Sequence, residues 1–220
     1  MSRSAVLAVL AVATATLLSC APSAPAGAFP DPRPDAPALT KGMQTAVLSG
    51  GCFWGVEGVF ERLRGVQQAE SGYAGGEADT ASYELVSTGT TGHAESVKIS
   101  YDPSIISYGM LLKIFFSIAH DPTELNYQGP DHGTQYRSAI FCANNDQKKA
   151  AQAYIEELTR KKVFARPIVT QVVPLKGFYP AEEYHQHFME RNPNYPYIMM
   201  YDRPKVLALQ RDYADLLAQR

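Results

Sequence analysis

Apolar residues recur along the chain with two periods, which predict strands and helices in alternation. Phe53, Val56, Phe60 and Leu63 share one face of an expected helix over 53–63. Strict alternation from His93 to Tyr101 predicts a strand. Further strands are expected at 45–49, 65–76, 135–143 and 168–173, and helices at 82–87, 105–119, 146–162 and 203–219. This order predicts an α+β fold, a two-layer sandwich of helices on a mixed sheet that resembles the ferredoxin-like plait.

The first 42 residues do not follow this pattern. Residues 1–19 begin with a basic Arg3 and continue as an uninterrupted apolar and small-residue run from Ala5 to Leu18, which indicates a signal peptide. Residues 20–42 are rich in Pro and Ala and are expected to form an extended, solvated linker. Residues 43–220 have the length of a single domain with its own core.

Two processing routes fit the end of the signal peptide. Leu17-Leu18-Ser19-Cys20 resembles a bacterial lipobox, which would make Cys20 the lipidated first residue of the mature protein. Ala26-Gly27-Ala28 offers a cleavage site for soluble secretion. We favour the lipobox because Cys20 directly follows the apolar run. Both routes predict an extracytoplasmic protein, in the bacterial periplasm or envelope, and the first predicts anchoring to a membrane.

Composition excludes several classes of function. Hydrophobic residues make up 45% of the chain and the net charge is −2, so nothing indicates nucleic acid as a partner. Apart from Cys20 there are only Cys52 and Cys142, without the spacing of a zinc site or a disulfide scaffold. A single disulfide between them stays open, although Cys142 fits a packed core position better. We expect no metal and a monomer.

The chain's candidate nucleophile follows the first strand. Gly50 and Gly51 allow a tight strand-to-helix turn, which places Cys52 at a helix N-terminus. Unpaired N–H groups and the helix dipole there favour a thiolate with a lowered pKa. The single Trp, Trp54, is close enough to line a pocket beside it. The alternative is a buried structural cysteine, since free Cys is among the most buried residue types.

The 93–101 strand supplies a candidate acid. Glu95 shares a face with Val97 and Ile99, so burial should raise its pKa and keep it protonated as a proton donor. The alternative is a Glu at a frayed strand end that reaches water. His93-Ala94-Glu95 also matches half of the zinc deaminase signature, but the other half, P-C-x-x-C, is absent.

A thiol, a carboxylic acid and the phenols of Tyr83 and Tyr136 suit the reduction of an oxygenated centre. The thiol would attack a polarised atom, the acid would protonate the departing oxygen, and the thiol would become a sulfenic acid. Two alternatives remain from the residues alone. One is a cysteine hydrolase with His93 as base, and the other is a non-catalytic aromatic binding module.

Motifs in order from Thr45 to Asn194 resemble the class A peptide methionine sulfoxide reductases. They are Gly51-Cys52-Phe53-Trp54-Gly55, Gly72-Tyr73-Ala74-Gly75-Gly76, Thr91-Gly92-His93-Ala94-Glu95, Tyr101-Asp102-Pro103, His120-Asp121-Pro122, Asp131-His132-Gly133-Thr134-Gln135-Tyr136-Arg137-Ser138 and Glu183-Tyr184-His185-Gln186. The resemblance implies reduction of the S epimer of methionine sulfoxide, free or in peptides, and hence repair of oxidised proteins.

The resemblance also assigns roles to the candidate residues. Cys52 attacks the sulfoxide sulfur and Glu95 donates the proton. In the same scheme Tyr83 and Tyr136 bind the oxygen, Phe53 and Trp54 take the methyl group, and Asp131 shapes the site. No cofactor is implied beyond an external thiol reductant, either a thioredoxin-like protein or a dithiol.

The chain departs from the family pattern at its C-terminus. Many members carry resolving cysteines there, whereas residues 192–220 contain none. Cys142 would resolve Cys52 only if its strand end moved, and otherwise an external thiol must attack the Cys52 sulfenic acid directly.

Overall fold

The computed structural model describes residues 29–36, 39 and 41–219. Its centre is a six-stranded sheet in the order β7-β6-β1-β3-β2-β8. β6 and β7 are parallel, and all other neighbouring strands are antiparallel. The strands are β1 (Gln44–Ser49), β2 (Val66–Ala74), β3 (Ala94–Tyr101), β6 (Ala139–Cys142), β7 (Gln171–Pro174) and β8 (Phe178–Pro180), with β4 (Tyr127–Gln128) and β5 (Asp131–His132) forming a separate hairpin.

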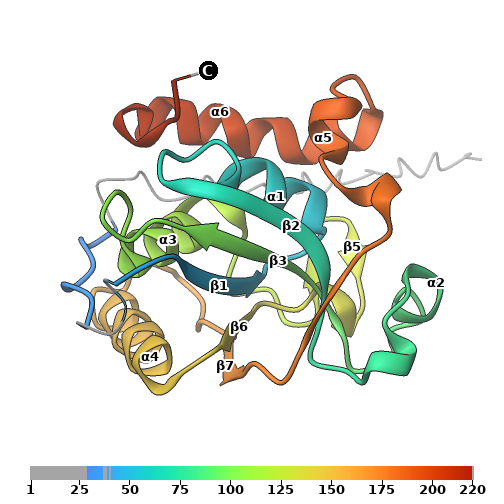
Figure 1. Cartoon of the computed structure of the whole chain (residues 1–220), viewed down its shortest axis with the longest axis horizontal. Coiled ribbons are helices and arrows are strands. Elements are labelled where there is room, and N and C mark those ends of the chain that lie inside the picture. Colours follow the sequence, from blue (N-terminus) through green and yellow to red (C-terminus); the bar gives the residue numbers. More distant parts are fainter. Residues whose placement is uncertain (1–28, 37–38, 40, 220) are drawn as a thin grey trace, which may run out of the picture.

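Helices cover one face of the sheet, so the α+β prediction is confirmed (Figure 1). The α-helices are α1 (Phe53–Phe60), α2 (Tyr83–Val86), α3 (Tyr108–Ile114), α4 (Asn145–Arg160), α5 (Phe188–Arg191) and α6 (Arg203–Asp212). α1 packs against β2 and β3, and α6 packs on the outer side of α1. Two π-helices, η4 (Phe115–Ala119) and η7 (Ile198–Asp202), extend α3 and precede α6.

Alternation along the strands divides the core between the two sheet faces. Leu48, Val97 and Ile99 point to the helical side and join the main core cluster with the buried face of α1. Val47 and Phe141 point to the other side, in a smaller cluster covered by the chain that leads from β7 to β8. α1 begins just beyond the C-terminal end of β1, on the side of the sheet that the helices cover.

Several element boundaries differ from the sequence predictions. The helix expected from 105 begins at Tyr108, because the hydroxyl of Ser107 accepts a hydrogen bond from the Met110 N–H and caps it there. The strand expected from 135 begins at Ala139, since residues 134–136 form a 3₁₀ turn. The strand expected over 168–173 is β7, displaced to 171–174. The last helix ends at Asp212, after which Leu217 forms a bridge with Leu63.

The described part of the expected linker is packed on the domain, so the prediction of a solvated spacer is wrong for it. Phe29 is buried and packs edge-on against Phe164. Both carboxylate oxygens of Asp35 accept hydrogen bonds at the start of α3, from the N–H groups of Tyr108 at 2.6 Å and Gly109 at 3.0 Å. The folded unit therefore begins by Phe29. Residues 1–28, which include the expected signal peptide and Cys20, lie outside the described residues.

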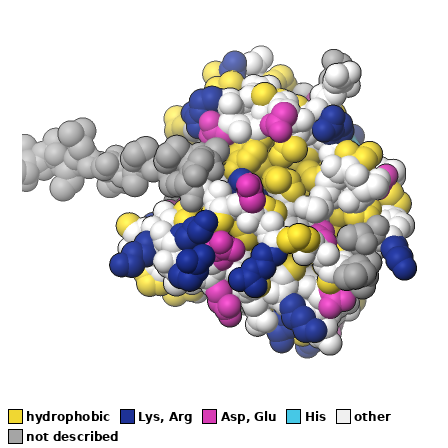
Figure 2. Space-filling model, turned by 90° about the vertical axis from the view of Figure 1, so that its left-hand side faces the viewer, with side chains coloured by type: hydrophobic (Ala, Val, Ile, Leu, Met, Phe, Trp, Pro, Cys, Tyr) yellow, Lys and Arg dark blue, Asp and Glu magenta, His cyan; other side chains and the backbone are white. Residues whose placement is uncertain are grey.

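The face of the molecule shown in Figure 2 carries basic and acidic side chains interspersed around a group of apolar ones. Among the helices in the described ranges, none combines the length and the apolar character needed to span a membrane.

Candidate functional site

Cys52 lies where the two-glycine turn leads from β1 into α1, of which it is the N-cap residue. Gly51 has a φ of +87°, and a Cβ added there would lie 2.5 Å from Cγ of Gln128. A Cβ at Gly50 would lie 2.9 Å from Cγ of His120. The turn is thus enclosed by side chains on both sides, and it holds the sulfur at the first turn of α1.

The Cys52 thiol has a raised pKa, not the lowered one that its position in the sequence predicts. Burial raises it well above its ordinary value, and the carboxyl groups of Glu95 and Asp202 add to the rise. The Trp54 N–H, which hydrogen-bonds the sulfur, opposes this effect and is outweighed. Cys52 is therefore favoured as a thiol, because desolvation exceeds the contribution of the helix N-terminus.

Glu95 is buried at the start of β3 and joined to the helix that carries Cys52. It is 3% exposed, so it does not reach water as a frayed strand end would. Its Oε2 accepts a hydrogen bond of 3.0 Å from the Phe53 N–H. Burial raises its pKa to about 8, and Asp131 and Asp202 add to the rise against the Phe53 hydrogen bond. At neutral pH the side chain is mostly a neutral carboxylic acid, as its strand position predicts.

The phenols of Tyr83 and Tyr136 approach this pair from two other elements. Burial and then Glu95 raise the pKa of each phenol, and Cys52 also raises both. Such interactions need proximity, so α2 and the 3₁₀ turn η5 (Thr134–Tyr136) converge with α1 and β3. The hairpin strand β5 adds Asp131, whose carboxylate accepts a hydrogen bond from the Tyr197 hydroxyl. The structure thus brings together the four groups expected to do the chemistry.

Trp54 forms an aromatic wall beside the thiol. Its indole stacks on Phe188 with 3.8 Å between ring centroids, and the rings of Tyr195 and Tyr197 stand edge-on to it. Phe53 is 1% exposed, with its ring against Tyr73 and His185. Phe53 is therefore part of the core, while Trp54 stays partly exposed.

Several residues that position this site have weak signals in the sequence. Both carboxylate oxygens of Glu182 accept hydrogen bonds, one from the Tyr83 N–H at 2.9 Å and the other from the Tyr73 hydroxyl at 2.8 Å. His185 is buried, and its Nδ1 accepts a hydrogen bond of 3.1 Å from the Trp54 indole. Only the motif Glu183-Tyr184-His185-Gln186 marks this region, and nothing local distinguishes Tyr197 or Asp202.

Comparison with known proteins identifies the family to which this site belongs. A family model described as peptide methionine sulfoxide reductase matches residues 44–216. The chain is 55% identical over 179 residues to peptide methionine sulfoxide reductase MsrA 2 of Mesorhizobium japonicum, covering 81% of this chain and 92% of the relative. It is 49% identical over 174 residues to MsrA of Deinococcus radiodurans, covering 79% and 84%. The chain belongs to the peptide methionine sulfoxide reductase family.

Solved structures of this family share the fold. The reduced form of Mxr1 from Saccharomyces cerevisiae is 37% identical with a TM-score of 0.64, covering 74% of this chain and 91% of that one. Methionine sulfoxide reductase A of Corynebacterium diphtheriae is 34% identical with a TM-score of 0.61, covering 76% and 84%. The chain is accordingly a class A reductase that converts methionine sulfoxide to methionine, the reaction that repairs oxidised proteins.

His93, the base that a hydrolase would need, is not available to Cys52 in this reductase. Its Nδ1 accepts a hydrogen bond of 3.2 Å from the Gly76 N–H. The other ring nitrogen therefore carries the proton and donates to the carbonyl of Glu77 at 2.9 Å. With both nitrogens bound to the backbone, His93 is a structural residue.

Cys142 is separated from Cys52 by the register of the sheet. Ser49, the last residue of β1, pairs with Ala139 of the antiparallel β6. Cys142 therefore lies three residues from Ser49 in the direction of the start of β1, whereas Cys52 lies beyond the end of β1. Three residues of strand span about 10 Å. Both cysteines are free, and burial raises the pKa of Cys142 to about 11. The structure therefore shows no disulfide between them.

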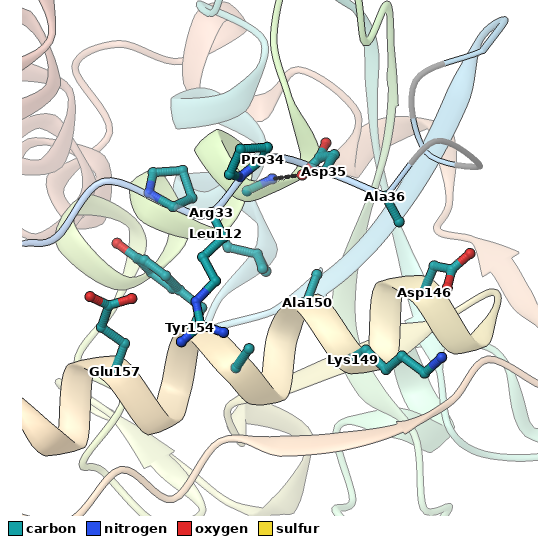
Figure 3. A pocket seen from close by; sticks show the side chains of 13 residues that line it. Arg33, Pro34, Asp35, Ala36, Leu112, Asp146, Lys149, Ala150, Tyr154 and Glu157 are labelled. Carbon is teal, nitrogen blue, oxygen red and sulfur yellow. Dashed lines mark hydrogen bonds between the residues drawn. The ribbon is translucent and has the colours of Figure 1, made fainter.

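A separate cleft of about 200 Å³ lies between the N-terminal segment and the helices α3 and α4 (Figure 3). Arg33 and Pro34 form one wall, and Ala150 and Tyr154 of α4 form the other. None of the candidate reductase residues lines it.

Proposed function

We propose that Cys52 and Glu95 carry out the reductase step on the S epimer of methionine sulfoxide. The observation that carries this proposal is the neutral carboxyl group of Glu95, buried with a pKa of about 8 and hydrogen-bonded to the first turn of the helix that presents Cys52. The Cys52 sulfur attacks the sulfoxide sulfur, and Glu95 gives its proton to the oxygen and recovers one from the thiol. Methionine leaves, and Cys52 holds the oxygen as a sulfenic acid.

The surrounding residues orient the substrate in this scheme. The Tyr83 and Tyr136 hydroxyls donate hydrogen bonds to the sulfoxide oxygen, which becomes more negative as the sulfur is attacked. Burial keeps both phenols protonated and able to donate, because it raises their pKa. The methyl group lies against Trp54, which Phe53 supports from below. Asp131, fixed by Tyr197, closes the pocket beside Tyr136.

An external thiol completes the cycle. Because the register separates Cys142 from the end of β1 that leads to Cys52, we infer that a thioredoxin-like protein or a small dithiol attacks the Cys52 sulfenic acid directly. One thiol displaces water to form a mixed disulfide, and a second thiol releases Cys52 as the reductant becomes a disulfide. Oxidised proteins and peptides are the substrates, and the enzyme acts as a monomer.

A single-turnover experiment tests the chemistry. The enzyme is mixed, without reductant, with a peptide that contains the S epimer of methionine sulfoxide. The masses of both the peptide and the enzyme are then measured by mass spectrometry. We expect the peptide to lose one oxygen atom and Cys52 to gain it, trapped by a sulfenic acid reagent. If the Cys52→Ser variant still removed oxygen from the peptide, Cys52 would be excluded as the nucleophile. Cleavage of the peptide would indicate a hydrolase.

The apolar run and Cys20 near the N-terminus support the proposal that the protein is an extracytoplasmic lipoprotein. A lipid on Cys20 would leave only residues 21–28 before the packed Phe29, a stretch that can span at most about 30 Å. The anchor would therefore hold the domain close to the membrane. Mass spectrometry of the mature N-terminus tests this, since an acylated Cys20 supports anchoring and an unmodified start at Phe29 supports soluble secretion.

The strand order β6-β1-β3-β2 also supports a ferredoxin-type plait as the central unit. Neighbouring strands in this set are antiparallel, and along the chain α1 lies between β1 and β2 and α3 between β3 and β6. β7 and β8 then extend the sheet at its two edges.

A further inference from the structure

One buried carboxyl group near the site lies behind the helix that carries Cys52. Asp202, at the junction of η7 and α6, is fully buried. Its Oδ1 forms an ion pair with Nζ of Lys205 at 3.1 Å, and its Oδ2 has no hydrogen-bond partner among the described residues. A buried carboxylate with one unsatisfied oxygen is costly to retain, and such groups concentrate at functional sites.

The ion pair lies directly on the first turn of α1. A Cβ added to Gly55 would be 2.1 Å from Oδ1 of Asp202 and 2.8 Å from Nζ of Lys205. Only a glycine at position 55, three residues after Cys52, leaves room for this contact. The charge of Asp202 is thereby held against the turn that presents the nucleophile.

We propose that Asp202 is a positioning residue of the reductase step, whose buried charge keeps Glu95 in its protonated, proton-donating form. The inference deepens the function proposed above and rests on it. A negative charge nearby disfavours ionisation of a second carboxyl group, so the acid persists to higher pH. The pKa directions agree, since Asp202 contributes to the raised pKa values of Glu95, Cys52 and Tyr197.

Other groups also act on Glu95 and on the ion pair. Burial raises the pKa of Asp202 itself, whereas the ion pair with Lys205 opposes that rise and favours the charged carboxylate. Lys205 also acts on Asp131. Asp131 raises the pKa of Glu95 in the same direction as Asp202, so removing Asp202 alone should lower that pKa without abolishing the shift. The titratable groups that face Glu95 are Cys52 on α1, Tyr73 on β2, Tyr83 on α2, Asp131 on β5, Tyr136 on η5 and Asp202.

The pH dependence of single-turnover sulfoxide reduction tests this role with the full chain. In the wild type the rate should fall above the pKa of Glu95, and in Glu95→Gln this alkaline limb should disappear. Asp202→Asn should move the limb to lower pH by about one unit. Asp202→Glu, which keeps the charge, should leave it near the wild-type position. Asp212→Asn is the matched control, because Asp212 pairs with Arg211 on the same helix, away from Gly55.

Two outcomes would overturn the inference. An alkaline limb unmoved in folded Asp202→Asn would show that the residue is only structural, while the wild-type limb would still support Glu95 as the acid. If Asp202→Asn does not fold, the double variant Asp202→Asn/Lys205→Met removes both charges and leaves no lone buried cation. The same downward shift is expected there, and its absence would also refute the role. Absence of the limb in the wild type would instead refute the proposed function of Glu95.

Discussion

The backbone N–H of Phe53 donates a 3.0 Å hydrogen bond to Oε2 of Glu95, so the helix that presents the nucleophile also fixes the acid. Phe53 is the first residue of α1, and its N–H is one of the donors that a helix start leaves unpaired. Glu95 satisfies that donor through one oxygen, which leaves its other oxygen free to carry a proton. This hydrogen bond, together with the packing of α1 on β3, holds Cys52 and Glu95 relative to one another.

Replacing Glu95 by Gln removes the proton donor and keeps the acceptor for the Phe53 N–H. We expect the reductase step to slow by about 100- to 10,000-fold, the usual contribution of a positioned general acid. Substrate binding should change little, because the pocket keeps its shape. Rapid-mixing kinetics of single-turnover reduction checks the rate, and peptide binding to the same variant is the control. A rate equal to that of the wild type would exclude Glu95 as the acid.

The reductase step should lose activity at alkaline pH. The reactive form of Glu95 is protonated, and its pKa of about 8 lies above the ordinary value of a carboxyl group. The rate should therefore be level below about pH 7 and fall about tenfold per unit once the pH exceeds the pKa. The check is a pH profile of single-turnover reduction between pH 5 and 10. A profile that rises steadily with pH would indicate that ionisation of Cys52, not protonation of Glu95, controls the step.

Local sequence patterns were sufficient for the parts of the site that lie within one element. The β1-turn-α1 unit and the face of β3 that holds Glu95 follow from short-range periodicity and spacing, whereas the roles of the phenols at 83 and 136 rest on the family resemblance. The pKa of Cys52 could not be predicted in this way, because it depends on what covers the helix start. Asp202 directly precedes the helix expected at 203–219, and only the packing of η7 and α6 on α1 brings it to Gly55.

The same reason explains the differences in the fold. A hydrophobic pattern locates an element, whereas its ends depend on contacts that are distant in sequence. The carboxylate of Asp35, in a segment that composition marks as linker, binds the start of α3. Similarly, Phe178 and Tyr179 form β8 only because β2 presents an edge for pairing. Neither contact has a local signal.

Substituting Gly51 with Ala should displace the nucleophile. The positive φ costs about 1–2 kcal/mol for a residue with a Cβ, and the added atom would also overlap Gln128. A shift of Cys52 by about 1 Å is enough to lower the rate by about 100-fold. Gly129→Ala is the matched control, since its φ is +55° but the added Cβ meets nothing within 4 Å. Unfolding and activity are compared for both, and equal loss of activity would contradict the role of the Gln128 contact.

Substituting Asp35 with Ala should destabilise the domain although it lies in the N-terminal segment. The side chain accepts two hydrogen bonds at the start of α3, and losing such a cap costs about 1–2 kcal/mol. Chemical denaturation measures the change in the free energy of unfolding. Arg33→Ala is the control from the same segment, because Arg33 is exposed and its replacement should change stability little. Equal stability of Asp35→Ala and the wild type would show that the segment is not part of the folded unit.

Substituting Cys142 with Ser should leave multiple turnovers with a small dithiol intact. Cys142 is buried near the opposite end of the sheet from Cys52, and β6 holds it there through pairing with both β1 and β7. To reach Cys52, it would have to break those pairings, whereas a dithiol from solution needs only access to the pocket. Steady-state turnover of the variant checks this, with free methionine sulfoxide as substrate. A collapse to one turnover per enzyme would show that Cys142 resolves the sulfenic acid and that the strand end moves during the cycle.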